Sequence, residues 1–202
     1  MKLISTPRTE VVRGLATEFL HNYARGRTII AVDGSDAAGR EAFADDLAEV
    51  LAERDHAVVR ASLRYFGLTK AAQEELGPDT PERQYRQGYD YASLQRALIA
   101  PFKLGGGAAF VTQQLDPERD IWIEPTWLTA PKDATLIVDG QFANRPELRG
   151  LWNWSVMVEG VPGTESEAER LYQDLEDPAG LATVAMDNTD PEHPRRRFFD
   201  SC

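Results

Sequence analysis

The sequence predicts a three-layer α/β fold, in which a mostly parallel sheet lies between helices and carries a small β-hairpin insertion. Apolar segments of strand length alternate with segments of helical periodicity, and this order is typical of parallel sheets. One apolar segment, at residues 28–32, runs directly into a turn with two spaced glycines and then into a helix. Both observations predict the same architecture.

The chain of 202 residues fits one domain, which we expect to span residues 1–202. It carries 33 acidic and 22 basic residues and a formal net charge of −11, which disfavours nucleic acid and anionic membranes as partners. Cys202 is the only cysteine, so no disulfide can form within the chain, and residues 1–8 lack the apolar stretch of a signal peptide. We therefore expect a cytoplasmic protein without a membrane segment.

The first third of the chain predicts a helix, a strand, a second helix and a second strand. Residues 1–26 contain a leading helix, because apolar side chains recur on one face of residues 9–24 and Gly26 ends the pattern. The strand at residues 28–32 follows. After the glycine turn comes a second amphipathic helix, and residues 56–63 form the second strand.

The middle of the chain predicts a long loop, a helix and the hairpin. Residues 64–90 are polar and rich in glycine and proline, too long a stretch for a simple connector, so we expect a functional or mobile loop there. Residues 91–100 form a short helix. Residues 108–113 and 121–128 are the candidate antiparallel pair. The remaining strands are expected at 135–139, 154–158 and 181–187.

The turn after the first strand has the glycine spacing of a phosphate-binding loop. Gly34 and Gly39 hold the two glycine positions, between an apolar strand and a helix. Glycines permit positive φ, so successive N–H groups can converge on an anion at the helix N-terminus. The expected binding residues are Gly34, Ser35, Asp36, Ala37, Ala38, Gly39, Arg40 and Glu41. The alternative is an ordinary strand-to-helix turn.

Two residues of this loop differ from the usual pattern. Arg40 stands where lysine is usual, and a planar guanidinium fits that space poorly. Glu41 stands where a hydroxyl usually helps to hold Mg²⁺; at ~4 Å and an effective dielectric constant of ~20 its charge would repel a phosphate by about 4 kcal/mol. Only an intervening cation reverses that sign. We therefore expect metal-free nucleotide to bind poorly, and Glu41 or Asp36 to occupy the anion site of the empty protein.

Five segments together carry a resemblance to a known family. They are Val32-Asp33-Gly34, residues 85–91 (Tyr-Arg-Gln-Gly-Tyr-Asp-Tyr), residues 136–140 (Leu-Ile-Val-Asp-Gly), residues 145–148 (Arg-Pro-Glu-Leu) and residues 187–190 (Asp-Asn-Thr-Asp). In this order they resemble the uridine kinase and phosphoribulokinase-like group of P-loop kinases, particularly its bacterial uridine kinase-like members. The resemblance implies a mostly parallel sheet flanked by helices, and transfer of the γ-phosphoryl group of ATP to a nucleoside or sugar hydroxyl.

The resemblance also implies roles for three polar residues. Asp139 matches the acid that holds the metal's water shell or the acceptor, so Asp139 and Glu41 are the candidate Mg²⁺ ligands. Asp90 matches an acceptor contact or a base, although a role as helix N-cap explains it equally well. Asn188 matches a segment near the adenine, and an Asx turn is its alternative.

Other positions depart from the family pattern. The family's base is an acid just after the second strand, but residues 62–66 read Ser-Leu-Arg-Tyr-Phe. Relatives close an arginine-bearing lid helix over the phosphates, whereas residues 160–176 are mostly acidic and look like a reduced lid region. The arginines at 195–197 lie in a tail, residues 191–202, and we expect a solvated basic tail there rather than a substitute lid.

These substitutions favour a uridine kinase-like P-loop protein with impaired or lost phosphotransferase activity. Such a protein would act as a nucleotide-, anion- or partner-binding module, with ATP and Mg²⁺ bound weakly. One alternative is an active kinase of a nucleoside or another small hydroxyl compound. Another is a structural subunit that binds no nucleotide. The four tryptophans suit a core or a dimer contact, so a homodimer through the hairpin at 108–128 is an expectation as well.

Overall fold

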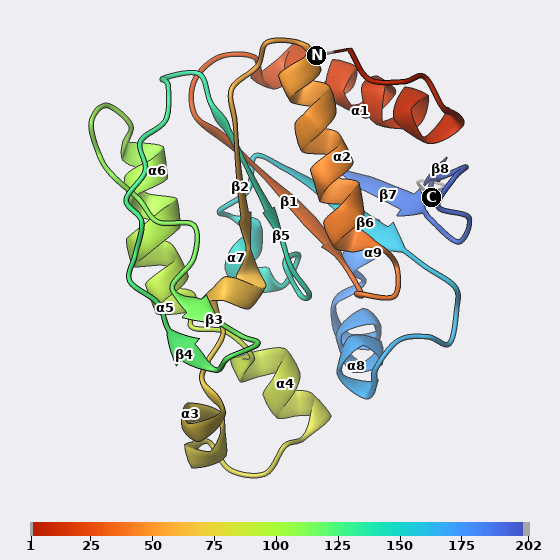
Figure 1. Cartoon of the computed structure of the whole chain (residues 1–202). Helices are drawn as coiled ribbons and strands as arrows, with labels where there is room; N and C mark the ends of the chain where they lie inside the picture. Colours follow the sequence, from red (N-terminus) through yellow and green to blue (C-terminus); the bar gives the residue numbers. More distant parts are fainter. Residues whose placement is uncertain (1, 200–202) are drawn as a thin grey trace.

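The computed structural model describes residues 2–199 and has a six-stranded central sheet with helices on both faces (Figure 1). In spatial order the strands are β2 (Val58–Ser62), β5 (Thr135–Asp139), β1 (Thr28–Gly34), β6 (Trp154–Glu159), β7 (Val184–Asp187) and β8 (Arg195–Arg197). The first five are parallel, and β8 is antiparallel to β7. The predicted α/β class is therefore confirmed.

β1 is the central strand and all its residues are buried. It pairs with β5 on one side and β6 on the other, and Val32 lies opposite Asp139 and Val156. Because these strands are parallel, their carboxyl ends meet at one edge of the sheet. The loops that follow them therefore come together there.

One face of the sheet is covered by α1 (Pro7–Tyr23) and α2 (Arg40–Glu53), and the other by a continuous helical segment. That segment comprises α5 (Tyr91–Leu94), a π-helical stretch (Gln95–Ile99) and α6 (Ala100–Leu104). Ile30 and Val32 pack under α1 and α2, whereas Ile29 and Ala31 face the other layer. Both faces of β1 are apolar for this reason. The short helix α7 (Pro146–Arg149) follows β5, and the short helix α9 (Pro178–Leu181) follows α8 (Glu167–Glu176).

The stretch expected as a long loop, residues 64–90, is largely helical. A 3₁₀ turn (Leu63–Phe66) leads to α3 (Lys70–Glu75) and α4 (Pro81–Gln87), whose N-termini are capped by Thr69 and Thr80. α4 packs against α8 (Glu167–Glu176) through the aromatic rings of Tyr85, Phe142 and Tyr172. Figure 1 shows α3, α4 and α8 beyond the carboxyl edge of the sheet.

The predicted hairpin is present. β3 (Leu115–Asp116) pairs antiparallel with β4 (Ile121–Trp122), and Phe110 pairs with Leu128 nearer its base. Of the four tryptophans, Trp154 belongs to the core, whereas Trp122 and Trp127 are exposed on the hairpin. No helix within residues 2–199 is long and apolar enough to cross a bilayer.

The arginines at 195–197 are partly as expected, because Arg195 and Arg197 are exposed, but they lie in a strand and not in an irregular tail. They form β8 at the edge of the sheet, where Arg196 pairs with Glu18 and Arg197 pairs with Glu159. The edge of β7 supplies backbone hydrogen-bond partners, and nearby acidic side chains supply ion pairs. These contacts stabilise the segment as a strand.

Candidate functional site

The glycine-spaced loop joins β1 to α2 in the predicted geometry. Gly39 is the residue before α2 and has φ of 73°, and Gly34 has φ of 142°. A Cβ at Gly34 would overlap the carbonyl oxygen of Val158, and one at Gly39 would lie 3.3 Å from Nδ2 of Asn188. Gly34 therefore requires glycine for conformation and for space, and Gly39 requires it for conformation.

Two backbone amides of the loop form hydrogen bonds within the loop. The amide of Ala38 donates to the carbonyl and hydroxyl oxygens of Ser35, at 3.2 and 3.0 Å, and the amide of Gly39 donates to the carbonyl of Asp36 at 3.0 Å. Ala37 lies within the same turn. These amides point to loop oxygens, so the loop is folded as a closed turn.

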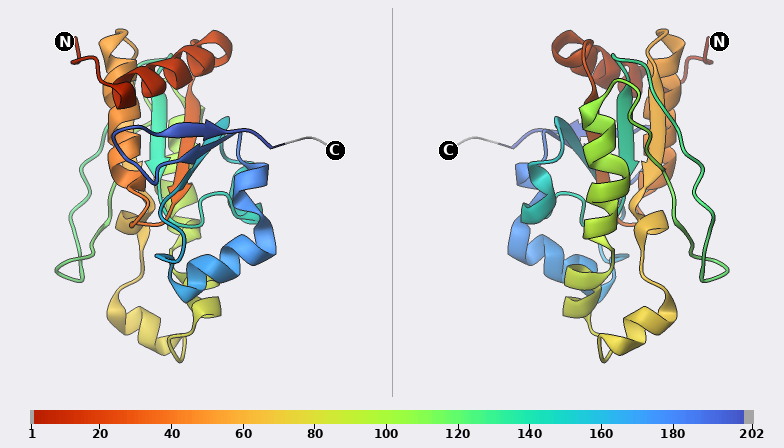
Figure 2. Two further views of the ribbon diagram at one scale, coloured as in Figure 1. Left: turned by 90° about the vertical axis from the view of Figure 1, so that its right-hand side faces the viewer. Right: turned by 90° about the vertical axis from the view of Figure 1, so that its left-hand side faces the viewer.

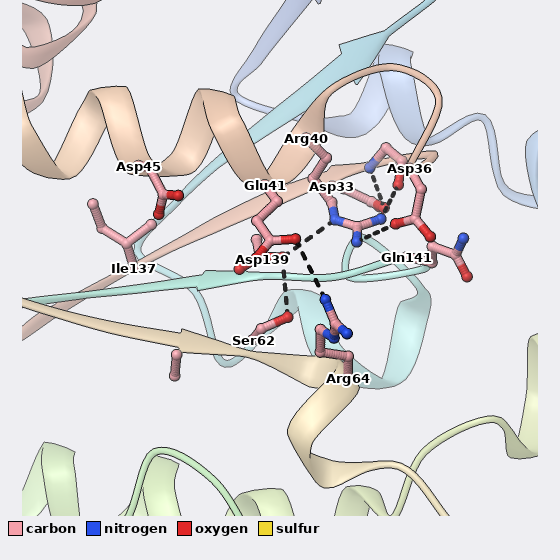
Figure 3. Close-up of polar contacts among 12 residues, drawn as sticks. Asp33, Asp36, Arg40, Glu41, Asp45, Ser62, Arg64, Ile137, Asp139 and Gln141 are labelled. Carbon is pink, nitrogen blue, oxygen red and sulfur yellow. Dashed lines mark hydrogen bonds and ion pairs between the residues drawn. The ribbon is translucent and has the colours of Figure 1, made fainter. Parts of the chain in front are cut away.

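Arg40 is bonded to protein oxygens on three sides (Figure 3). Its Nη1 donates to the carbonyl of Gly34 at 2.7 Å, its Nη2 to Oδ1 of Asp36 at 2.6 Å, and its Nε to Oδ2 of Asp139 at 3.4 Å. The Arg40 side chain is only 4% exposed. Burial lowers the pKa of the guanidinium, but the charges of Asp139 and Asp36 outweigh burial, so the pKa lies above its ordinary value.

Asp139 is fully buried at the end of β5 and holds two arginines. It accepts from Ser62 Oγ at 3.0 Å, from Arg60 Nη2 at 3.1 Å and from Arg40 Nε. Neighbouring β2 brings Arg60 and Ser62 to it, because Ser62 lies opposite Asp139 in the sheet. The charge of this carboxylate is therefore compensated within the protein.

Glu41 does not join Asp139 as the sequence led us to expect. Its carboxylate faces the guanidinium of Arg64, with Oε2 3.6 Å from Nη1, as Figure 3 shows. Within residues 2–199 no group of three or more His, Cys, Asp or Glu side chains could hold a metal ion. With Asp139 already paired to two arginines, this donor set does not fit Mg²⁺.

Of the two acids expected to fill the anion site, Glu41 lies elsewhere, and Asp36 binds the arginine that a phosphate would need. In the described part of the chain, Asp36 accepts from Arg40, and Glu41 pairs with Arg64. The side chain that occupies the centre of the loop region is Arg40 itself. A ligand phosphate would have to compete with Asp36 and Asp139 for it.

A cavity of about 700 Å³ opens beside this cluster. Its charged lining comprises the acids Asp36, Glu41 and Asp45 and the arginines Arg40 and Arg64. Each of these charged side chains has a partner in the protein, because Arg40 binds Asp36 and Asp139, Glu41 faces Arg64, and Asp45 pairs with Arg60. Tyr89 and Gln141 complete its far side and also line a cavity of about 200 Å³ between α4 and α8. Burial raises the pKa of the Tyr89 hydroxyl, so it stays neutral at pH 7.

A buried carboxylate ties α8 to the loop. Asp33 accepts from the amide of Gly34 at 2.7 Å, from the amide of Asn144 at 2.8 Å and from the hydroxyl of Tyr172 at 2.6 Å. Burial raises the pKa of Asp33, and its three donors oppose that rise. Sequence reasoning missed this link; the only signal was an acid directly before Gly34 at the end of an apolar strand.

Asp90 has the role of its simpler interpretation, a helix N-cap, whereas Asn188 makes no Asx turn and binds the glycine-spaced loop instead. Asp90 caps α5, because its Oδ1 accepts from the amide of Ser93 at 2.8 Å. Asn188 is buried, and its Nδ2 donates to the carbonyl of Ala38 at 2.7 Å. Its Oδ1 accepts from Nη1 of Arg8 at 3.3 Å. Asn188 and Arg8 thus brace the loop, a contact that the sequence did not indicate.

The structure resembles solved structures of small-molecule kinases. The fold matches a "possible uridine kinase" from Bacillus stearothermophilus with a TM-score of 0.72 and 20% identity, over 88% of this chain and 98% of that one. The chain has the P-loop kinase fold. A D-glycerate 3-kinase from Cryptococcus neoformans matches with a TM-score of 0.52 and 12% identity, over 90% of this chain and 89% of that one.

These likenesses are in fold and not in sequence. No family model matches the chain, and the search of curated proteins found no match. At these identities the comparisons confirm the expected architecture. The activity has to be inferred from the residues of the site.

Proposed function

We propose that this P-loop kinase-like protein has lost phosphotransferase activity and serves as a binding module for a nucleotide or another small phosphate-bearing molecule. The observation that carries the proposal is the state of Arg40, which is buried and bonded to Gly34, Asp36 and Asp139. The single cysteine of the sequence agrees with a place in the cytoplasm.

Loss of transfer follows from what the reaction needs. Phosphoryl transfer requires cations around the moving group, a bound metal, and a group that orients or deprotonates the attacking hydroxyl. Here the arginine of the loop is neutralised, and Asp139 is compensated by Arg40 and Arg60. After β2 stands Arg64 instead of an acid, and a guanidinium cannot accept a proton from a hydroxyl.

Weak binding follows from the same contacts. The Asp36 carboxylate is 78% exposed, whereas Asp139 is fully buried, so a phosphate can replace Asp36 on Arg40 more readily than it can replace Asp139. The Asp139 pair is buried and does not yield in this way. Glu41 adds repulsion at the mouth of the loop. The attraction between a bound phosphate and Arg40 is therefore weakened, because Asp139 continues to share the charge of this arginine.

The direct test is a transfer assay on the purified chain. ATP, Mg²⁺ and either uridine or cytidine are incubated with the protein, and products are followed by ³¹P NMR. We expect no phosphorylated nucleoside above the protein-free control. Phosphorylation of either nucleoside that is abolished in Asp139→Ala would contradict the proposal and favour an active kinase. If calorimetry detects no binding of ATP or ADP, with or without Mg²⁺, a structural subunit would be favoured instead.

A further inference from the structure

Three arginines lie around the glycine-spaced loop, and they differ in how their donors are used. The guanidinium of Arg40 donates hydrogen bonds from all three of its nitrogens. That of Arg60 does the same, to two carboxylates and two backbone carbonyls. Arg64 has only longer contacts, with Nη1 3.6 Å from Oε2 of Glu41 and Nη2 3.8 Å from Oε1 of Glu118. Both distances exceed that of a hydrogen bond, so among these three arginines Arg64 keeps its donors for a ligand.

The position of Arg64 lets it meet a ligand in the cavity beside the loop. Arg64 lies in the 3₁₀ turn Leu63–Phe66 that follows β2, and its guanidinium lies 5.4 Å from the ring centroid of Tyr65. Its side chain is 38% exposed, whereas that of Arg40 is 4% exposed. Figure 3 shows its guanidinium directed toward Glu41. Arg64 belongs to the wall of the cavity of about 700 Å³, so its donors can be reached from there.

The two acids near Arg64 are weak competitors for it. Glu41 comes from α2 and Glu118 from the hairpin, and both views of Figure 2 show these elements on the same side of the molecule. The side chains are 52% and 85% exposed. Ion pairs between exposed groups contribute little, because water solvates both partners. An oxyanion that approaches Nη2 therefore displaces Glu118 into solvent at small cost.

The free donors select the charged part of the ligand. A guanidinium is a planar fork that binds two oxygens of one oxyanion, and phosphate is a preferred partner. A single phosphate at Arg64 stays outside the glycine-spaced loop. A triphosphate that entered the loop would meet Glu41 and would have to displace Asp36 from Arg40. The site therefore favours a phosphate monoester over a nucleoside triphosphate.

The far side of the cavity offers neutral polar groups for the rest of the ligand. Nε2 of Gln141 donates to Oε1 of Glu169 at 2.9 Å, which leaves Oε1 of Gln141 to accept from a ligand. The hydroxyl of Tyr89 lines the same side. We propose that Arg64, and not Arg40, binds the phosphate of a small phosphate monoester, whose uncharged part extends toward Tyr89 and Gln141. This inference rests on the proposed binding function and adds the ligand class and the residue that binds its charge.

Calorimetric titration of the full chain with uridine 5′-monophosphate and with uridine, without Mg²⁺ or ATP, tests this inference. We expect the monophosphate to bind at least about tenfold more tightly than uridine, because only the monophosphate has the charged group. Arg64→Gln should abolish this preference. Glu118→Gln should tighten binding of the monophosphate about twofold to fivefold, because it removes a competitor for Nη2 of Arg64.

Arg119→Gln is the matched control. It removes the same charge from the adjoining hairpin, where the side chain is 79% exposed and does not line the cavity, and should leave both affinities unchanged. Circular dichroism verifies that the variants are folded. The inference is overturned if the monophosphate binds no better than uridine, if its preference survives in Arg64→Gln, or if Glu118→Gln weakens it. The titration contains no phosphoryl donor, so its failure and the failure of the proposed function in the transfer assay are separate results.

Discussion

Arg40 and Asp139 form a buried ion pair where the glycine-spaced loop meets the end of β5, with Nε and Oδ2 3.4 Å apart. One partner comes from the first turn of α2 and the other from the neighbouring strand of β1. Asp139 binds Arg60 as well, so one buried carboxylate serves two guanidinium groups. The charge that a phosphate-binding loop would offer its ligand is in this way directed into the protein.

The first prediction concerns the stability that this pair confers. Asp139→Asn leaves two arginines without their shared counter-charge, one of them buried, and should lower the free energy of unfolding by about 3–5 kcal/mol. Urea denaturation measures it. Asp45→Asn is the matched control, because it removes the exposed partner of Arg60 and should cost no more than about 1 kcal/mol. Equal small losses in both variants would mean that the buried pair contributes nothing.

The second prediction concerns the brace on the loop. Arg8 donates to Oδ1 of Asn188 and to the carbonyl of Pro191, and Asn188 holds the carbonyl of Ala38. Arg8→Ala should therefore speed hydrogen exchange at the loop amides by about tenfold. Mass spectrometry of a peptide that covers the loop measures it. Arg13→Ala is the control, because Arg13 lies on α1 like Arg8 but forms its ion pair with Glu53 of α2. Unchanged loop exchange in Arg8→Ala would show that the brace is not needed.

The third prediction concerns the pH dependence of stability. In the folded state burial raises the pKa of Asp33, so the folded protein binds this proton more tightly than the unfolded chain does. The contribution of Asp33 is then greatest at pH below its unfolded pKa and falls as pH rises through the folded pKa. Tyr172→Phe removes a donor that opposes the rise, so its stability should fall more steeply than that of the unaltered protein as pH rises above the ordinary aspartate pKa of ~3.9.

Tyr85→Phe is the matched control for this experiment. The Tyr85 hydroxyl donates to Glu176 at 2.8 Å. Tyr85→Phe therefore also removes one hydrogen bond of a buried tyrosine, at a cost of about 1–3 kcal/mol, but this bond does not involve Asp33. Its pH profile should run parallel to that of the unaltered protein. Parallel profiles for Tyr172→Phe too would refute the assigned role of Asp33.

The fourth prediction concerns the glycine at the start of the loop. Gly34→Ala brings a Cβ against the carbonyl of Val158 at a backbone conformation that favours glycine, and should destabilise the fold by about 2 kcal/mol or more. Gly107→Ala is the control, because a Cβ there meets nothing within 4 Å. Thermal denaturation compares them. Equal melting temperatures would show that the loop adopts another conformation in solution.

The sheet and the loop could be predicted because their signals are local. Apolar runs such as residues 28–32 and 135–139 mark buried strands, and the glycine spacing fixes the strand-to-helix turn. The helices within residues 64–90 also have local signals in the sequence. Thr69 and Thr80 each precede a helix, and a proline follows Thr80 at the first helical position.

The state of the site could not be predicted because it depends on strand order. Arg40 meets Asp139 only because β5 pairs beside β1, and Arg60 joins them only because β2 pairs beside β5. Similarly, Tyr172 reaches Asp33 across 139 positions of sequence through the packing of α8. A motif supplies the residue at each loop position, but the partners of its side chain come from distant strands.

The most direct measurement of the central claim is calorimetric titration with ATP, with and without Mg²⁺, of the unaltered protein and of a double variant. Arg40→Lys with Glu41→Thr restores a flexible charge and removes the repelling acid. We predict weak binding by the unaltered protein and at least about tenfold tighter Mg·ATP binding by the double variant, with no such gain in Asp45→Asn. Tight binding of ATP by the unaltered protein, or a double variant that binds no better, would contradict the account.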